Sequence, residues 1–191
     1  MSKKQVFVAK GSSPWYHSTW IDMIEPSHVI NTDKSVSGQA TVTCEGLNYM
    51  GSMFCNCYNL TALDLSNFDT SSVTDMSALF FYCDNLTALD LSSFDRSKVK
   101  NMYSMFENCF SLAKLDLSSF DTSKVKNMRN MFWGYENLTT IKGVIDMKSC
   151  TKNYERMFTN CTNLKNVKIK NPPPDFESNT CLSSSQYVVV S

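Results

Sequence analysis

The sequence contains few of the residues and motifs on which most catalytic and metal sites depend. Only two of the 191 residues are histidine, His17 and His28, and both precede the internal repeats of the chain. There is no Gly-rich phosphate-binding loop, no Gly-x-Ser-x-Gly motif and no histidine spacing typical of a metal site. We therefore expect no enzymatic activity, no metal site and no other cofactor.

The chain also lacks an excess of charge and any long hydrophobic run. Its 18 lysines and arginines balance 18 aspartates and glutamates, whereas a nucleic-acid-binding domain needs a basic surface. The longest apolar run covers residues 78–83, which is far too short to cross a bilayer. These two features argue against a nucleic acid partner and against membrane insertion.

The N-terminal residues do not have the pattern of an export signal. The apolar segment 5–9 is shorter than the hydrophobic region of a signal peptide, which spans about 7–15 residues. The eight cysteines are therefore expected to be reduced thiols rather than a disulfide framework. A protein released by cell lysis, such as a virion component, would share these features. The localisation stays open among the virion, the cell surface and the cytoplasm, and we favour the virion.

What the sequence does contain is an internal repeat with a period of 26 residues. The segment LDLSNFD at 63–69 recurs as LDLSSFD at 89–95 and again at 115–121. Two further columns run through the repeats: Phe54, Phe80, Phe106, Phe132 and Phe158, and Leu60, Leu86, Leu112, Leu138 and Leu164. About five units fill residues 37–170, between non-repeat segments at 1–36 and 171–191. One unit cannot bury its apolar face alone, so neighbouring units are expected to stack.

The spacing of apolar residues within a unit predicts a short strand followed by a helix. Leu115 and Leu117 alternate with polar residues, which is typical of a strand. Asp121 then offers side-chain oxygen atoms to the start of a helix. The residues that follow are spaced as on one face of an amphipathic helix: Val125, Met128, Met131, Phe132, Tyr135 and Leu138. The expected fold class is therefore α/β, a solenoid with a parallel sheet on one face, helices on the other and non-repeat caps at its ends.

The junctions between units carry a family resemblance. Residues 60–65 read Leu-x-x-Leu-x-Leu, which is the start of the leucine-rich repeat signature. The longer phrase Leu-Asp-Leu-Ser-x-Phe-Asp-x-Ser-x-Val-x-x-Met-x-x-Met-Phe resembles the BspA-like leucine-rich repeat family. That resemblance implies a short leucine-rich-repeat solenoid used for binding or adhesion, as in bacterial surface proteins and some bacteriophage structural proteins.

The function expected from this resemblance is a non-catalytic recognition module. The favoured setting is a bacteriophage virion or tail, where the chain would bind a host-surface or virion partner. The alternatives are a bacterial surface adhesin, whose anchor would lie outside this sequence, and an intracellular protein-interaction scaffold.

The strand half of the repeat carries the residues expected to form a binding surface. One aspartate and one serine per unit project from the solvent face of the predicted sheet: Asp64, Ser66, Asp90, Ser92, Asp116 and Ser118. Like charges on neighbouring strands repel, so this acidic row would attract a cation or a basic partner; the alternative is a soluble sheet face whose charges are screened. The row ends at Lys142 and Lys168, so a protein or glycan ligand on this face would lie toward the N-terminal half.

Two other repeated sets have both a structural and a functional interpretation. For one column, burial in the core is favoured over a metal or redox role: Cys57, Cys83, Cys109 and Cys161, with Tyr135 in the fourth place. For the basic stripe, a solvated face is favoured over a polyanion site: Lys98, Lys100, Lys124, Lys126, Arg129 and Lys152. The methionine columns are expected to pack in the core.

The flanking segments are expected to cap the stack. Trp15, Tyr16 and Trp20 lie in segment 1–36 and either cover one end of the core or dock the chain into a homo-oligomer or a larger assembly. The three prolines at 172–174 end the repeat. Residues 187–190 are expected to form a final strand that pairs with the sheet.

Overall fold

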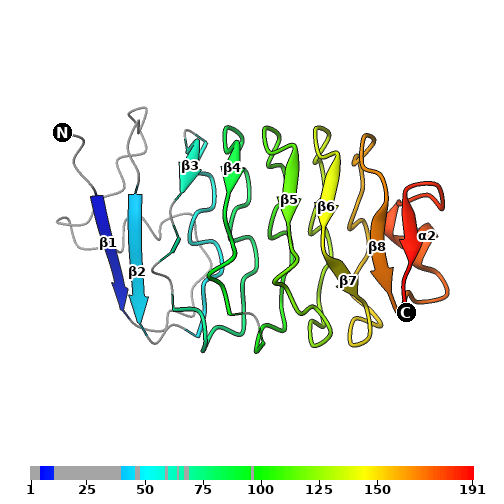
Figure 1. Cartoon of the computed structure of the whole chain (residues 1–191), viewed down its shortest axis with the longest axis horizontal. Coiled ribbons are helices and arrows are strands. Elements are labelled where there is room, and N and C mark those ends of the chain that lie inside the picture. Colours follow the sequence, from blue (N-terminus) through cyan, green and yellow to red (C-terminus); the bar gives the residue numbers. More distant parts are fainter. Residues whose placement is uncertain are drawn as a thin grey trace.

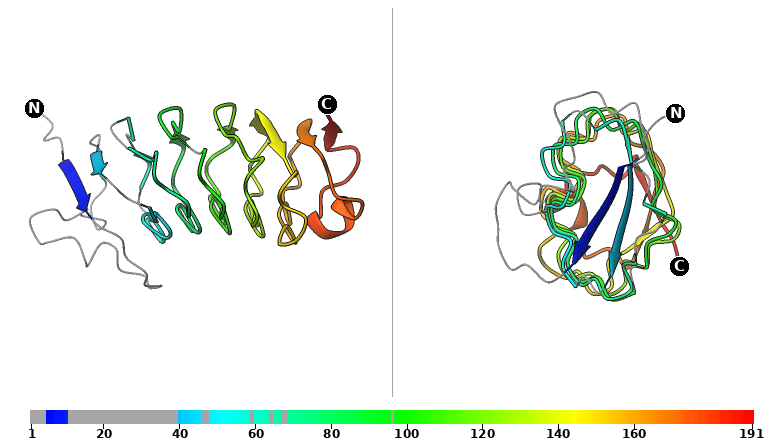
Figure 2. Two further views of the ribbon diagram at one scale, coloured as in Figure 1. Left: turned by 90° about the horizontal axis from the view of Figure 1, so that it is seen from below. Right: turned by 90° about the vertical axis from the view of Figure 1, so that its left-hand side faces the viewer.

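The molecule is an elongated stack of coils, in which each repeat winds once around the long axis (Figure 1). The computed structural model describes the backbone of residues 5–10 and 40–45, and residues 48–191 except 59, 64, 67, 68 and 96. The N-terminal strand lies at one end of the stack and the C-terminus at the other (Figure 1). Viewed along the axis, successive coils superpose (Figure 2), so residues at the same repeat position form columns.

Short parallel strands form one side of the stack. They are β1 (Gln5–Lys10), β2 (Ala40–Glu45), β3 (Ala62–Leu63), β4 (Ala88–Leu89), β5 (Lys114–Asp116), β6 (Thr140–Lys142), β7 (Val144–Asp146), β8 (Val167–Lys170) and β9 (Tyr187–Val189). They pair as β1-β2, β3-β4, β5-β6 and β7-β8-β9. In β3-β4 and β5-β6 each residue pairs with the one 26 positions later, as in Leu63 with Leu89. The repeat period therefore sets the register.

The other side of each coil is a ribbon of tight turns, where the sequence predicts a helix. This turn ribbon comprises residues 49–57, 75–83, 101–109, 127–135 and 153–161. In the second coil, alternate N–H groups donate to the carbonyl three residues back at 3.1–3.3 Å: Leu79, Phe81 and Cys83. The N–H groups between them donate to the next coil at 2.7–3.0 Å: Met76, Ala78, Phe80 and Tyr82. The ribbon is thus bonded both within and between coils.

The predicted strand-helix leucine-rich-repeat solenoid is therefore wrong. In the described part of the chain the only α-helix is α2 (Phe176–Thr180), which lies outside the repeats. Two residues of each ribbon have positive φ, which a right-handed helix excludes. In the second coil these are Ala78 (+52°) and Tyr82 (+56°), each at the third position of a four-residue turn, as in a type II turn. Apolar residues spaced by three arise because residues flanking such turns point inward.

The aspartates predicted at helix starts begin short turns instead. Their Oδ1 atoms accept a hydrogen bond from the N–H two residues later at 2.9–3.0 Å: Asp69 from Ser71, Asp95 from Ser97, and Asp121 from Ser123. This arrangement is an Asx-turn. The side-chain oxygen satisfies a local N–H, as expected, but the next residues of the chain form the edge of the stack rather than a helix.

Columns of similar side chains fill the interior. The rings of the phenylalanine column stack with centroids 5.3–5.8 Å apart and planes within 13°: Phe54, Phe80, Phe106, Phe132 and Phe158. The first methionine column is fully buried: Met50, Met76, Met102 and Met128. A single coil would leave both sides of each ring in water, so burial and coil stacking depend on each other.

One coil departs from the common length, and a glycine absorbs the difference. The pairing separation changes from 26 residues, at Asp116 with Lys142, to 24 residues, at Ile145 with Ile169. Gly143 has a φ of +107°, and a Cβ there would lie 2.7 Å from the carbonyl of Leu117. Only glycine fits this bulge, and Ile145 takes the buried place beyond it.

The C-terminal segment covers the last coil. Phe176 of α2 is buried, and its ring contacts Tyr187 edge-on with centroids 5.2 Å apart. Strand β9 pairs with β8, as the sequence predicts for the final strand, and leaves Val188 and Val189 about half exposed at 47% and 62%. Among the described residues, no helix has the length and apolar character needed to cross a bilayer.

Candidate recognition surfaces

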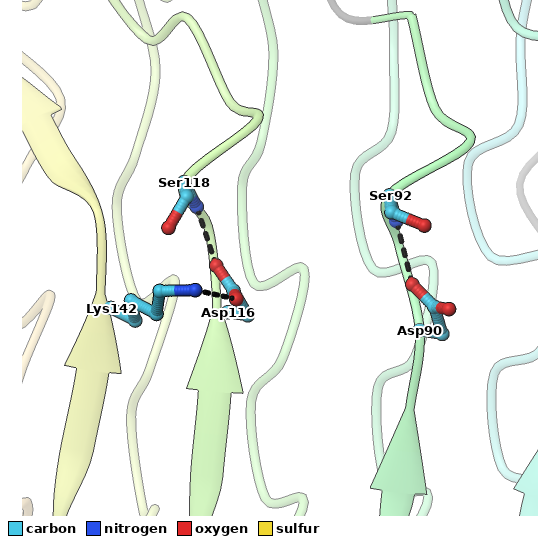
Figure 3. Close-up of polar contacts among 5 residues, drawn as sticks. All are labelled: Asp90, Ser92, Asp116, Ser118 and Lys142. Atoms are coloured by element: carbon cyan, nitrogen blue, oxygen red, sulfur yellow. Dashed lines mark hydrogen bonds and ion pairs between the residues drawn. The ribbon is translucent and has the colours of Figure 1, made fainter.

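The aspartates of the predicted acidic row close turns at the ends of the strands. Asp90 Oδ1 accepts the Ser92 N–H at 2.9 Å, and Asp116 Oδ1 accepts the Ser118 N–H at 2.8 Å (Figure 3). Both aspartates are exposed, as is Ser66 in the preceding coil, whereas Asp64 lies outside the described residues. One oxygen of each described carboxylate therefore has a local structural partner.

The C-terminal end of this row is neutralised. Lys142 Nζ lies 2.8 Å from Asp116 Oδ2, because strands β5 and β6 pair these two residues directly (Figure 3). Lys142, together with the Ser118 N–H, holds the pKa of the Asp116 carboxyl well below its usual range. Both oxygens of Asp116 are thus engaged, which leaves less of the predicted row open to a ligand.

Two parts of the sequence-based site prediction have no structural counterpart to describe. The predicted docking residues Trp15, Tyr16 and Trp20 lie outside the described residues. Within the described part of the chain, no cluster of histidine, cysteine, aspartate and glutamate could hold a metal ion.

Exposed aromatic residues gather on the turn ribbon of the first three coils. Tyr58 is 48% exposed and Tyr103 is 40% exposed. The Tyr58 ring meets the Tyr82 ring edge-on with centroids 6.4 Å apart, and Tyr82 meets Phe81 edge-on at 4.6 Å. We call these four residues the aromatic surface. Sequence reasoning missed it, although its signal was present: each of these aromatics interrupts a column that holds other residue types in the neighbouring repeats.

Charge is separated along the axis of the stack. Residues 35–95 contain seven acidic residues and no lysine or arginine, whereas residues 96–170 contain fourteen basic and six acidic residues. The aromatic surface begins in the acidic half. The zero net charge therefore conceals two halves of opposite sign.

The family of the chain follows from a comparison with known protein families. A family model described as "Mycoplasma protein of unknown function, DUF285" matches residues 48–171. The chain belongs to this family. The match covers the coils from the first ribbon to the end of β8. No curated protein and no solved structure matches the chain.

The thiol column of this DUF285 domain is buried in the core. Cys83, Cys109 and Cys161 donate their S–H groups to carbonyl oxygens of the preceding coil at 3.0–3.1 Å. Burial raises the pKa of Cys109 and of Cys161 to about 12. A thiol with so high a pKa is a poor nucleophile and metal ligand. The buried interpretation is confirmed for this column.

Lysines mark the edge of the DUF285 domain that leads into the turn ribbon. Lys100, Lys126 and Lys152 occupy one column, all three are exposed, and we call them the lysine row. The Lys126 N–H donates to the Lys100 carbonyl at 2.8 Å, so these two residues stand on adjacent rungs. Beside them, Lys124 Nζ donates to the Ser97 carbonyl at 3.0 Å. The helix that this basic stripe was expected to flank is absent from the described coils, and the stripe follows a straight edge of the stack.

Proposed function

We propose that the chain is a non-catalytic recognition module that contacts a protein partner through its aromatic surface. The single observation that carries this proposal is the exposure of Tyr58 and Tyr103 on a backbone whose every coil is hydrogen-bonded to the next. Tyrosine is enriched among residues that dominate binding energy, because it offers a large rigid area with a polar tip. A rigid scaffold loses little conformational freedom on binding.

The surroundings of the aromatic surface support a protein partner. Small polar side chains with positive φ flank it on the same ribbon, among them Ser52, Asn56 and Ser104. Mixtures of tyrosine, serine and asparagine are typical of protein-binding loops. Because residues 35–95 contain no lysine or arginine, the partner that fits this half best carries positive charge.

The biological setting follows from the sequence resemblance. We favour a bacteriophage virion or tail component that binds a host-surface or virion partner. The bacterial surface adhesin and the intracellular scaffold are the alternatives, and each uses the same surface. The acidic row on the strand side stays a second predicted surface, tested by replacing Asp64, Asp90 and Asp116 with asparagine.

Photo-crosslinking tests the proposal. A photoreactive benzoylphenylalanine is placed at position 58 or 103 of the full chain, with Thr140 on the strand side as the control position. The experiment is carried out in the organism that produces the chain. We expect positions 58 and 103 to capture the same protein, and position 140 not to capture it.

The captured protein is then purified and titrated with the unmodified chain. The double variant Tyr58→Ser/Tyr103→Ser should bind it at least about tenfold more weakly, since tyrosines at binding hot spots contribute about 2 kcal/mol or more. An asparagine triple variant of the acidic row should bind normally. Unchanged affinity in the tyrosine variant would refute the proposal, as would capture from position 140 alone.

A further inference from the structure

We infer that the lysine row binds a linear acidic polysaccharide along the edge of the stack. This inference concerns a different surface from the aromatic surface and does not depend on it. It rests on three observations: the spacing of the lysines, their exposure without a salt-bridge partner among the described residues, and the excess of basic residues in this half of the chain.

The spacing of the lysine row is fixed by the backbone. Lys100 and Lys126 lie on adjacent hydrogen-bonded rungs, and such rungs are about 4.8 Å apart. Lys152 holds the same repeat position in the next coil. The result is a regular line of positive charges parallel to the long axis.

The ammonium groups of this line are available to a ligand. All three side chains are exposed, and none of them forms a salt bridge with a described residue. Equal charges on neighbouring rungs repel one another, and a bound anion would remove that repulsion. The fourteen basic residues within 96–170, against six acidic ones, extend the positive field around the row.

The geometry favours an acidic polysaccharide over a nucleic acid. A sugar ring with its glycosidic oxygen is about as long as one rung, so one anionic group per sugar can face one lysine. Successive phosphates of a B-form DNA strand advance only about 3.4 Å along the axis and wind around it. A straight edge with one charge per rung does not follow that path. The ligand class is therefore a polysaccharide carrying carboxylate or sulfate groups.

The chain itself supplies matched variants for the test. Thr74 occupies the column of the lysine row in the second coil, and its N–H joins the same ladder of bonds. The variant Lys100→Thr/Lys126→Thr therefore introduces a residue that this column already accommodates. The control Lys114→Thr/Lys165→Thr removes the same charge from the strand side, in columns that hold threonine at 140 and 139. Circular dichroism and thermal unfolding establish that both variants fold.

Binding is measured by fluorescence anisotropy of labelled polymers at low and moderate salt. The probes are polygalacturonate, dextran sulfate, neutral dextran and a single-stranded oligothymidylate. We expect one or both acidic polysaccharides to bind, and the lysine-row variant to bind about three- to thirtyfold more weakly than the parent chain. The slope of log K against log salt should fall by about 2, since each lost contact releases roughly one counterion fewer. The control should change by less than about twofold.

Several results would overturn the inference. One is equal loss of affinity in the control, which would mean that net charge alone drives binding. Another is oligothymidylate or neutral dextran binding as tightly as the acidic polysaccharides, and a third is no binding at low salt. The variant Tyr58→Ser/Tyr103→Ser should keep its polysaccharide affinity, so failure of this inference and failure of the proposed function are distinguishable.

Discussion

The side chain of Asn108 occupies the space that a side chain at position 134 would need. A Cβ built on Gly134 would overlap Asn108 Oδ1, and Gly134 itself has a φ of +73°. Asn108 also has positive φ, at +59°. The two residues share one column of the turn ribbon, so the asparagine of one coil depends on the glycine of the next.

Replacing Gly134 with alanine should destabilise the stack strongly. The substitution combines an unfavourable backbone conformation with a steric clash, and we expect the free energy of unfolding to fall by about 2 kcal/mol or more. Urea denaturation measures this change. In the double variant Asn108→Gly/Gly134→Ala the clash is gone, so the loss should be smaller than the sum of the single losses. Strict additivity would show that Asn108 does not restrict position 134.

Replacing Tyr135 with phenylalanine should stabilise the protein. Tyr135 takes the cysteine place in the thiol column and is fully buried, yet its hydroxyl has no hydrogen-bond partner among the described residues. Removing an unsatisfied buried hydroxyl should raise the free energy of unfolding by about 1 kcal/mol.

The matched control is Tyr154→Phe, which should have the opposite effect. The Tyr154 hydroxyl donates to Asp175 Oδ1 at 2.5 Å, and losing this bond should lower the free energy of unfolding by about 1 kcal/mol. Urea titrations of both variants give the two signs directly. A destabilised Tyr135→Phe variant would mean that its hydroxyl has a partner in solution.

The thiols should fall into two reactivity classes at pH 8. Cys181 is exposed and Cys55 half-buried, whereas five others are buried: Cys57, Cys83, Cys109, Cys150 and Cys161. Burial raises the pKa of Cys57 to about 12 and that of Cys150 to about 11, so few thiolates form there. With Cys44 replaced by serine, a disulfide reagent should modify Cys181 rapidly and Cys55 more slowly. Rapid modification of the five buried thiols in the folded protein would contradict the buried column.

The ion pair of Asp116 predicts a specific titration. Lys142 and the Ser118 N–H favour the charged carboxylate, so the folded pKa lies below the unfolded one. Its contribution to stability is therefore complete above the ordinary aspartate pKa of about 4, and is lost as the pH falls through the lower folded value. Carbon NMR of the Asp116 carboxyl measures that pKa. Lys142→Ala and added salt should each raise it toward the ordinary value, because the pair is exposed.

The parts of the fold that follow from apolar repetition were predictable from the sequence. The columns headed by Phe54 and Leu60 identified the coils and their register, and Leu115 identified a strand. The wrong element was the helix, because inward-pointing residues of consecutive turns are also spaced by three. The signal against a helix lay in asparagine and glycine at the positive-φ positions, as at Asn130 and Gly134, since these residues favour turns.

The candidate surfaces were less predictable for a physical reason. Repetition shows what packing requires at every rung, so it highlights residues such as Asp90 and Asp116, whose carboxylates close turns. A recognition surface needs departures from the repeat, as at Tyr58 and Tyr103. Such departures have no periodic signal, and their neighbours come from other coils, so their grouping is visible only in three dimensions.

The continuity of the buried columns makes the length of this protein adjustable in fixed steps. Residues 63–88 and 89–114 begin with nearly the same sequence, and Leu63 and Leu89 pair in register. Deleting one such unit would join like to like in every column and shorten the molecule by about 4.8 Å, whereas duplicating one would lengthen it by the same amount. Unequal recombination between these near-identical segments of the gene could thus change the reach of the protein and the number of lysine or tyrosine rungs without a new folding problem.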